Sequence, residues 1–297
     1  MTTQLKITNL TKKFKNFTAL NNINLELNSG EVLGYIGPNG AGKSTTIRSI
    51  LGILHPTNGQ IEIFGQDAFK DASKIHEKLA YVPGDVYLWP NLTGGETIDL
   101  LLKMNNQKHS QLTDELIKDF DLDISKKNKT YSKGNRQKVA LIAAFSTEAE
   151  IYIFDEPTSG LDPLNEEVFK KHLKKLKDNG KSILLSSHIL SEVQEVADRI
   201  AIIRNGQIIQ TGTLEEMQYL TDTLVEAQVS GDPQELKNMP GVSNLVIKDK
   251  KVSFQVDSDN LNNTINYLSS IGLASLKSTK PTLEQIFLQY YKVSGDK

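Results

Sequence analysis

Hydrophobic and polar residues alternate at the start of the chain. Leu5 and Ile7, and after a polar connection Ile23, Leu25 and Leu27, follow the two-residue period of half-buried strands. The alternation therefore predicts an antiparallel β layer at the beginning of the protein.

Continuous apolar runs replace the alternation farther along the chain. They occupy residues 151–154 and 183–186 and are typical of parallel strands that are covered on both faces. A further strand is expected at residues 61–64, and helical patterning dominates from about residue 95 to 145. The first two-thirds of the chain is therefore predicted to have an α/β fold.

The texture of the sequence changes after Gly212, where short elements follow one another. The pattern predicts strands at residues 224–229, 242–247, 252–256 and 274–277, and helices at residues 234–237, 261–271 and 283–291. This βαββαβ order with one further helix predicts a small ferredoxin-like domain. We expect residues 1–218 to form the first domain and residues 219–297 the second.

Composition and charge exclude several classes of function. Apolar residues make up 38% of the chain and charged residues 24%, which is enough for a folded core. The 34 Lys and Arg against 36 Asp and Glu leave a net charge of −2, so we expect no nucleic-acid partner. The lack of cysteine excludes disulfides and thiolate metal sites and fits a cytoplasmic protein. No signal-peptide pattern and no apolar run of about 18–20 residues is found, so the chain is expected to stay outside the bilayer.

Residues 37–44, GPNGAGKS, match the phosphate-binding pattern G-x-x-x-x-G-K-[ST]. The match follows an apolar run at residues 32–36 and precedes a predicted helix at residues 44–51, which is the context that the pattern requires. Glycines let backbone N–H groups converge on phosphate oxygens, and the helix N-terminus favours the same anion. We predict a nucleoside triphosphate as ligand, with Lys43 on the phosphates and the Ser44 hydroxyl on Mg²⁺; the alternative is a glycine turn without a ligand. The predicted binding residues of this loop are Gly37, Pro38, Asn39, Gly40, Ala41, Gly42, Lys43, Ser44 and Thr45.

The apolar run at residues 151–154 ends in two adjacent acids, Asp155 and Glu156. Adjacent side chains at the end of a strand diverge, so the two carboxylates can take separate roles. The first can hold Mg²⁺ through water, and the second can polarise an attacking water molecule. The alternative, a solvated acidic turn, does not normally follow so apolar a run.

Together with residues 155–163, DEPTSGLDP, these motifs resemble the nucleotide-binding subunits of ATP-binding cassette (ABC) transporters. The resemblance covers about residues 4–218 in motif order. It implies a P-loop NTPase core with an antiparallel β subdomain and a helical signature subdomain, beside the small α+β C-terminal domain. It also implies that Asp155 associates with the metal ion and that Glu156 is the catalytic base.

The same resemblance implies roles for other residues. His188, at the end of a predicted strand, matches the histidine that contacts the γ-phosphate and its attacking water; the alternative is an ordinary polar residue. Residues Ser159 to Asp162 match the loop that crosses the interface between two subunits. Phe14 matches the aromatic residue that stacks on adenine, and its alternative is an ordinary apolar residue in a hairpin.

The signature segment, residues 131–138, reads YSKGNRQK where the family commonly has Leu-Ser-Gly-Gly-Gln. Ser132 and Gly134 are retained, and they can meet a γ-phosphate from the N-terminus of the following helix. Lys133 replaces a glycine. Its ammonium is expected near the phosphates of the opposite subunit or on a neighbouring acid, and the alternative is a solvated lysine.

A second departure lies at Gly84, where the family typically carries a glutamine that ligates Mg²⁺ and touches the membrane partner. Glycine has no side chain to coordinate a metal ion, so either water completes the metal shell or Asp85 reaches in. We expect water, with Asp85 as a sensor rather than a fixed ligand. The following segment to Pro90 contains Tyr87 and Trp89, which are candidate anchors for a helix of a transmembrane permease. Their alternative is packing inside the helical subdomain.

The resemblance also implies how the protein works. One chain has one phosphate loop and one signature, whereas each nucleotide in this family is clamped between the loop of one subunit and the signature of another. We expect a homodimer or a pair with a homologous ATPase around two ATP, with Mg²⁺, on the inner face of the cell membrane. Residues 281–288, PTLEQIFL, resemble the ending of ATPases of bacterial drug, antibiotic and polysaccharide exporters. This similarity favours export. It suggests that the C-terminal domain helps the subunits to dimerise or regulates them, and the alternative is a domain that only packs against the rest of the protein.

Two other classes of protein fit the sequence less well. An ABC-type ATPase without a permease, in translation control or DNA repair, usually has two fused cassettes or a long coiled-coil insertion, and neither feature occurs in the sequence. If the protein were a small-molecule kinase, the serine and glycine of the signature segment would have no explanation.

Overall fold

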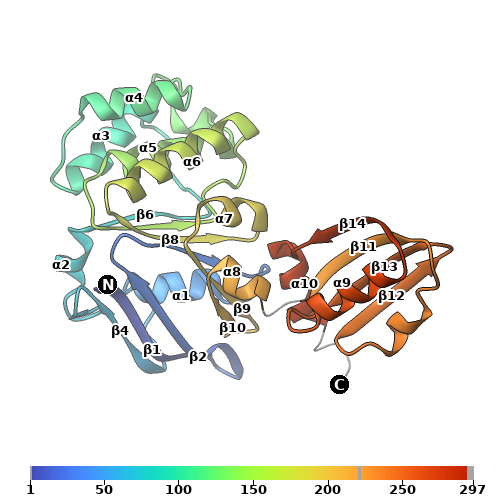
Figure 1. Ribbon diagram of the computed structural model, residues 1–297. Helices are drawn as coiled ribbons and strands as arrows, with labels where there is room; N and C mark the ends of the chain where they lie inside the picture. Colours follow the sequence, from blue (N-terminus) through green and yellow to red (C-terminus); the bar gives the residue numbers. More distant parts are fainter. Residues whose placement is uncertain (1, 220–221, 293–297) are drawn as a thin grey trace. The chain divides into compact units, whose positions relative to one another are not determined.

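The computed structural model describes residues 2–219 and 222–292. The chain forms two compact units, Met1–Thr211 and Gly212–Lys297 (Figure 1). In the described part of the chain, no helix combines the length and the apolar character needed to cross a membrane.

An antiparallel sheet opens the first unit, as the alternation of the sequence predicts. Its strand order is β2-β1-β4-β5. The strands are β1 (Thr3–Phe14), β2 (Phe17–Asn28), β4 (Asn58–Ile63) and β5 (Gln66–Asp67). Leu5 pairs with Leu27 on the buried face, while the neighbouring pair, Lys6 and Glu26, forms a 3.0 Å ion pair on the exposed face. The two-residue period therefore separates core from solvent.

A second sheet, with strand order β10-β9-β3-β8-β7-β6, forms the centre of the first unit. The strands are β3 (Val32–Ile36), β6 (Leu79–Val82), β7 (Ile151–Asp155), β8 (Ser182–Ser187), β9 (Arg199–Arg204) and β10 (Gln207–Gly212). The first five of these run parallel. Every residue of β3, β7 and β8 is buried, which explains the apolar runs at residues 151–154 and 183–185. Because parallel strands end at one edge, the segments that follow these three strands meet there.

Helices flank this sheet and also form a helical region of their own. They are α1 (Lys43–Ile50), α2 (Ala72–His76), α3 (Gly94–Met104), α4 (Gln111–Asp119), α5 (Lys133–Ser146), α6 (Pro163–Asp178) and α7 (Leu190–Val196), with a 3-10 turn at Asn128–Thr130. Figure 1 shows α3, α4 and α5 gathered together beyond β6. Thr93 and Glu96 cap α3 reciprocally, and Ser110 caps α4. The polar breaks in the helical pattern are thus the starts of new helices.

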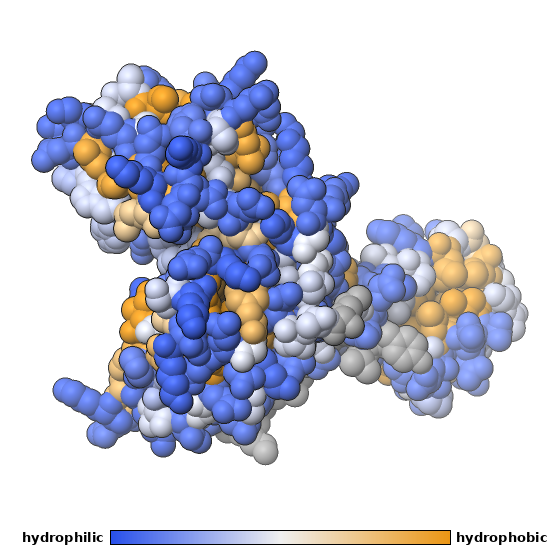
Figure 2. Space-filling model, turned by 90° about the vertical axis from the view of Figure 1, so that its left-hand side faces the viewer, coloured by the Kyte–Doolittle hydropathy of each residue, from blue (hydrophilic) through white to orange (hydrophobic). Residues whose placement is uncertain are grey.

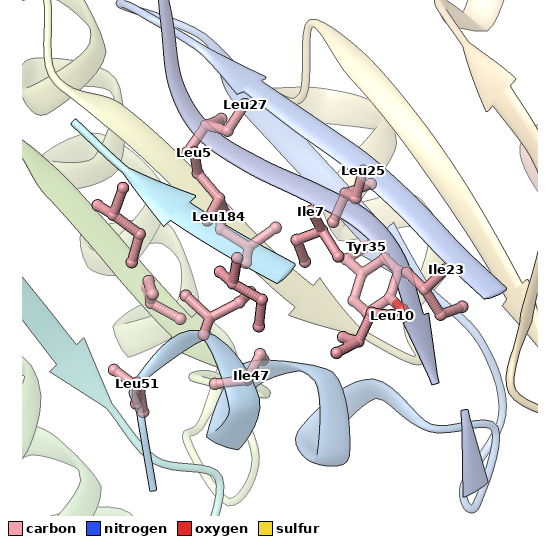
Figure 3. Packing of buried hydrophobic residues seen from close by; sticks show 14 of the residues in the cluster. Leu5, Ile7, Leu10, Ile23, Leu25, Leu27, Tyr35, Ile47, Leu51 and Leu184 are labelled. Atoms are coloured by element: carbon pink, nitrogen blue, oxygen red, sulfur yellow. The ribbon is translucent and has the colours of Figure 1, made fainter. Parts of the chain in front are cut away.

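The core of the first unit joins the two sheets to α1. Figure 3 shows apolar side chains of β1 and β2 facing Tyr35 of β3 and Ile47 of α1. Tyr35 is fully buried, and its hydroxyl makes a 3.1 Å hydrogen bond with Thr46 of α1. Burial raises the pKa of Tyr35, so this group stays neutral. The contact fixes α1 against β3, the two elements on either side of the phosphate-binding pattern.

The second unit has the predicted ferredoxin-like arrangement. Its sheet has the order β12-β13-β11-β14, with antiparallel pairing throughout. Its elements are α8 (Leu214–Tyr219), β11 (Thr223–Val229), a 3-10 turn (Gln234–Asn238), β12 (Val242–Lys248), β13 (Lys251–Val256), α9 (Leu261–Ser270), β14 (Leu273–Thr279) and α10 (Leu283–Lys292). Its own core centres on Phe254, Val225 and Leu268.

The division between the units lies after Thr211, not after residue 218 as the sequence suggests. The difference concerns α8, which packs with α10 of the second unit. The side-chain amide of Gln218 in α8 also donates to the carbonyl oxygen of Pro281 at 2.9 Å. Both contacts join residues that are far apart in the chain, so the sequence near residue 218 gives no sign of them.

Candidate functional site

The phosphate-binding pattern forms the turn between β3 and α1. A Cβ atom at Gly37 would lie 2.4 Å from the carbonyl oxygen of Ile203, so only glycine fits there. Gly42 has a φ of +117° and caps α1, and no side chain among the described residues caps it by hydrogen bonding. The first N–H groups of α1 can therefore bind an anion, as helix N-termini commonly do.

Lys43 begins α1 and is only 4% exposed. Its Nζ donates to the carbonyl oxygens of Gly37 (2.6 Å) and Pro38 (3.2 Å) and lies 3.2 Å from Oε1 of Glu156. The ammonium is thus held within the turn rather than extended into solvent. The other predicted residues of the turn are the exposed Asn39, Gly40 and Ser44, the half-buried Thr45 and the buried Ala41.

The two acids at the end of β7 diverge as predicted. Asp155 is buried, and its Oδ1 accepts a hydrogen bond from the hydroxyl of Ser186 on β8. Glu156 has a φ of +50°, which is uncommon for a residue with a side chain, and its N–H donates to the carbonyl oxygen of Ser186 at 3.0 Å. Ser186 was not predicted as a site residue, because its position opposite Asp155 comes from the register of β7 and β8.

His188 follows β8 and meets the second acid. Its Nδ1 lies 3.1 Å from Oε2 of Glu156, whose other oxygen faces Lys43. The carboxylate of Glu156, just after β7, therefore bridges two residues: Lys43 at the start of α1 and His188 just after β8. The structure brings together the predicted base, the histidine predicted to contact the γ-phosphate, and the predicted phosphate-binding lysine.

Glu192 of α7 is a second residue that the sequence analysis missed. Its Oε2 accepts hydrogen bonds from Thr158 Oγ1 at 2.9 Å and from Ser187 Oγ at 3.3 Å. Burial raises the pKa of this carboxyl. Glu192 links the loop after β7 to the last residue of β8, and no motif in the sequence marks it because Thr158 is distant in the chain.

The signature residues Ser132 and Gly134 lie at the start of α5. Ser132 caps the helix, since its Oγ accepts from the N–H of Asn135 at 3.2 Å. A Cβ atom at Gly134 would lie 2.4 Å from the carbonyl oxygen of Gly160, so the start of α5 packs directly on the loop after β7. The predicted interface residues and the signature are thus neighbours within one chain.

Asp162 caps α6 in the structure. It accepts from the backbone N–H of Asn165 at 3.1 Å and from the amide of the same residue at 2.7 Å. The backbone hydrogen bond from Asn165 lowers the pKa of Asp162, followed by the side-chain bond. Its hydrogen bonds therefore have a structural explanation, and its role in binding stays a prediction.

Phe14 lies at the tip of the β1–β2 hairpin and is 45% exposed. The hairpin passes the phosphate-binding turn, because a Cβ atom at Gly42 would lie 2.8 Å from Leu20 of β2. Lys12 places its ammonium 5.1 Å from the centre of the Phe14 ring. Phe17 pairs with Phe14 across the hairpin and is exposed as well, so the structure offers a second aromatic candidate that the sequence analysis passed over.

Residues after β6 line an apolar groove of about 400 Å³. Tyr87 is 90% and Trp89 47% exposed, which excludes their predicted alternative, burial in the helical region. The opposite wall includes Leu101 of α3 and Ala140 of α5. In Figure 2, several apolar patches interrupt the mostly hydrophilic surface of the first unit.

Mg²⁺ prefers oxygen ligands, and the predicted residues supply them. Ser44 offers a hydroxyl oxygen on the exposed side of α1, and Asp155 offers a carboxylate with one oxygen held by Ser186. The donor set fits the ion. No cluster of three or more histidine or acidic side chains suited to a metal is found among the described residues, so water and phosphate would have to complete the shell.

A buried parallel strand, a glycine-rich turn, a helix and an acid at the end of β7, two strands away in the same sheet, define a P-loop nucleoside triphosphatase. Residues 20–159 match the family model described as ABC transporter. Residues 212–291 match the model described as ATP-binding protein DrrA1-3-like, C-terminal domain.

Similar proteins agree with the match to the ABC transporter model. The bacitracin transport ATP-binding protein BcrA of Bacillus licheniformis is 32% identical over 77% of this chain and 76% of its own length. The linearmycin resistance ATP-binding protein LnrL of Bacillus subtilis is 29% identical over 96% and 97%. The dimeric structure of a post-hydrolysis state of the ATP-binding cassette MJ0796 bound to ADP and Pi is 28% identical, with a TM-score of 0.64 over 71% of this chain and 98% of the other. This chain belongs to the family of ABC transporter ATP-binding proteins, and this ATPase family implies binding and hydrolysis of ATP.

Proposed function

We propose that the protein hydrolyses Mg·ATP as one of two paired subunits and thereby drives a separate transmembrane permease, in export of drugs, antibiotics or other amphipathic compounds. The observation that carries the proposal is the position of Glu156 between Lys43 and His188. A carboxylate at this place can act as a base toward water at the end of a phosphate chain that lies on the turn.

The residues divide the chemical work as follows. The N–H groups at the start of α1 and the ammonium of Lys43 bind the phosphates, which replace Glu156 as the anionic partner of Lys43. Glu156 then accepts a proton from the attacking water, while His188 keeps the carboxylate and the water oriented. Ser44 and Asp155 would hold Mg²⁺, whose positive charge would stabilise the negative charge that develops on the phosphate oxygens.

The proposal requires a second subunit, because the signature residues Ser132 and Gly134 serve the nucleotide of the partner. The dimeric MJ0796 cassette with ADP and Pi supports pairing as a property of a similar protein. Hydrolysis releases the γ-phosphate contacts, so ATP and ADP stabilise different states of the pair.

The apolar groove with Tyr87 and Trp89 supports a permease as the further partner. A groove with exposed aromatic side chains fits an amphipathic helix. Through that contact the subunit would lie on the inner face of the membrane. The names of BcrA and LnrL, which mention bacitracin transport and linearmycin resistance, support an antibiotic or similar compound as the cargo.

The test uses the native complex purified from membranes, with Glu156→Gln as the central variant. We expect hydrolysis to slow by about 10²–10⁴-fold, the range for loss of a general base, while ATP binding persists and ATP-bound pairs accumulate in light scattering. Glu150→Gln is the matched control, since Glu150 pairs with Lys78 at 3.0 Å just before β7. A Glu156→Gln protein that hydrolyses at the wild-type rate, or that never pairs in Mg·ATP, would overturn the proposal.

A further inference from the structure

Lys133, one of the two departures from the family pattern, lies in contact with Asp85, the residue that follows the other departure at Gly84. Nζ of Lys133 is 3.8 Å from Oδ1 of Asp85 and donates a 2.8 Å hydrogen bond to Oγ of Ser159. Lys133 belongs to the start of α5, Asp85 to the segment after β6 and Ser159 to the segment after β7. One ammonium group therefore joins the start of α5 to two loops of the ATPase unit.

The aliphatic part of the Lys133 side chain is held in place too. A Cβ atom at Gly160 would lie 3.3 Å from both Cγ and Cδ of Lys133, so the methylene groups cover the backbone of Gly160. Gly134, the next residue in α5, also packs on Gly160. Lys133 is thus held against the loop that carries Ser159, and it is not a freely solvated lysine.

Helix stability does not explain a lysine at this position. The positive end of a helix dipole repels a cation in the first turn, and the first turn of α5, KGNR, contains no acid that would compensate. The carboxylate that pairs with Lys133 belongs to Asp85, on another segment. The lysine therefore costs α5 some stability locally and gains an anionic partner only through the fold.

The segment that carries Asp85 also reaches the catalytic acids and the apolar groove. A Cβ atom at Gly84 would lie 3.1 Å from the carbonyl oxygen of Asp155 and 3.6 Å from Cβ of Glu156. On the other side, Val86 and Tyr87 line the groove. A displacement of this segment would therefore be felt at Glu156 through Gly84 and at Lys133 through Asp85.

We propose that Asp85 and Lys133 are positioning residues whose ion pair couples the segment lining the groove to the signature and to Ser159. The proposal rests on the proposed function, because it assigns a route by which an occupied groove acts on the nucleotide site. Neither residue touches the reacting atoms. The pair aligns the start of α5 with the loop after β7, so that Ser132 and Gly134 can meet the nucleotide of the paired subunit.

Charge reversal in the native complex tests the pair. The variants are Asp85→Lys, Lys133→Asp and the two combined, each assayed for kcat, KM for ATP and melting temperature. We expect each single change to lower kcat about three- to fivefold, the size that an exposed ion pair supports, with KM and melting temperature near wild type. The combined variant should recover at least half of the wild-type kcat. Reversal of the exposed pair Lys6 and Glu26, 3.0 Å apart, is the matched control and should leave all three quantities unchanged.

Two results would overturn the coupling. If the effects of the two single changes simply multiply in the combined variant, the residues act independently. If Lys133→Asp slows hydrolysis while Asp85→Lys is silent, the lysine meets phosphates directly. Failure of the proposed function is distinguishable, because it would appear in the wild-type complex itself as ATP hydrolysis that does not depend on Glu156.

Discussion

The ammonium of Lys43 lies 3.2 Å from Oε1 of Glu156, and Lys43 is almost fully buried. A buried charge without a partner costs several kcal/mol, so this ion pair satisfies the lysine. Phosphate oxygens offer the same negative charge and stronger hydrogen bonds. Nucleotide binding can therefore exchange one anionic partner of Lys43 for another and release Glu156 for chemistry.

Replacing Lys43 with methionine should weaken nucleotide binding. The change keeps an unbranched side chain of similar volume but removes the cation, whose hydrogen bonds to charged groups contribute about 1.5–3 kcal/mol. We expect the affinity for Mg·ATP to fall about 10- to 150-fold in equilibrium titration with a fluorescent nucleotide. Lys78→Met, which removes an exposed ion pair with Glu150, is the control. Equal affinity of the Lys43→Met protein and the wild type would contradict the role of the turn.

The hairpin aromatics can be separated by paired substitutions. Phe14 is expected to stack on adenine, whereas Phe17 stands opposite it across the hairpin. An aromatic stacking contact contributes about 0.5–1.5 kcal/mol, so Phe14→Ala should weaken ATP binding about 2- to 13-fold and Phe17→Ala should not. Comparing the binding of ATP with that of inorganic triphosphate separates the contribution of adenosine from that of the phosphates. The reverse outcome would move the adenine contact to Phe17.

Substitution of the groove aromatic should separate partner binding from nucleotide binding. Tyr87 is almost fully exposed and lines the groove beside Trp89. Loss of an aromatic anchor typically costs about 2 kcal/mol or more, so Tyr87→Ala should reduce retention of the permease about 30-fold at equilibrium while ATP affinity stays constant. Leu112→Ala, an exposed change on α4, serves as control. Unchanged retention would exclude Tyr87 as an anchor.

His109 connects α3 and α4 through hydrogen bonds to one acid on each helix. Its Nδ1 lies 2.7 Å from Asp99, and its Nε2 lies 3.0 Å from Asp114. The hydrogen bond with Asp99, followed by that with Asp114, raises the pKa of His109 above its ordinary 6.5. The folded state therefore binds the proton more tightly than the unfolded chain. The two hydrogen bonds of His109 then contribute their full stabilisation of the fold below pH 6.5, and this stabilisation is lost as the pH rises through the raised pKa.

Thermal unfolding of the wild type and of His109→Gln between about pH 5.5 and 9 measures the contribution of these two hydrogen bonds. The variant should be less stable than the wild type at the acidic end of the range. The difference in melting temperature should shrink toward the alkaline end. A difference that stays constant with pH would show that packing, and not charge, accounts for the effect of His109.

Much of the fold could be predicted because its signals are local. The alternation around Leu5 and Ile7 gives a strand with one buried face, and the buried runs of β7 and β8 follow from their uninterrupted apolar residues. The second unit follows the predicted order of elements closely. The unit boundary differed because the contact of Gln218 with Pro281 joins residues far apart in the chain.

The candidate site shows the same division. The glycine pattern with Lys43 and the acid pair at residues 155–156 are contiguous in the sequence, so their chemistry can be read from spacing alone. Ser186 and Glu192 escaped notice because their partners lie in other segments. Lys133 was expected near the phosphates of the opposite subunit or on a neighbouring acid, and only the packing of the loops brings it to Asp85.

By itself, the order of residues determined the strand and helix pattern, the phosphate-binding turn and the family resemblance, since each depends on side chains within one short stretch. The tertiary structure decided which groups share a charge: Glu156 with Lys43 and His188, and Asp85 with Lys133. These pairings depend on strand order and loop packing, and Coulomb attraction and hydrogen bonding act over a few ångströms in space whatever the separation along the chain.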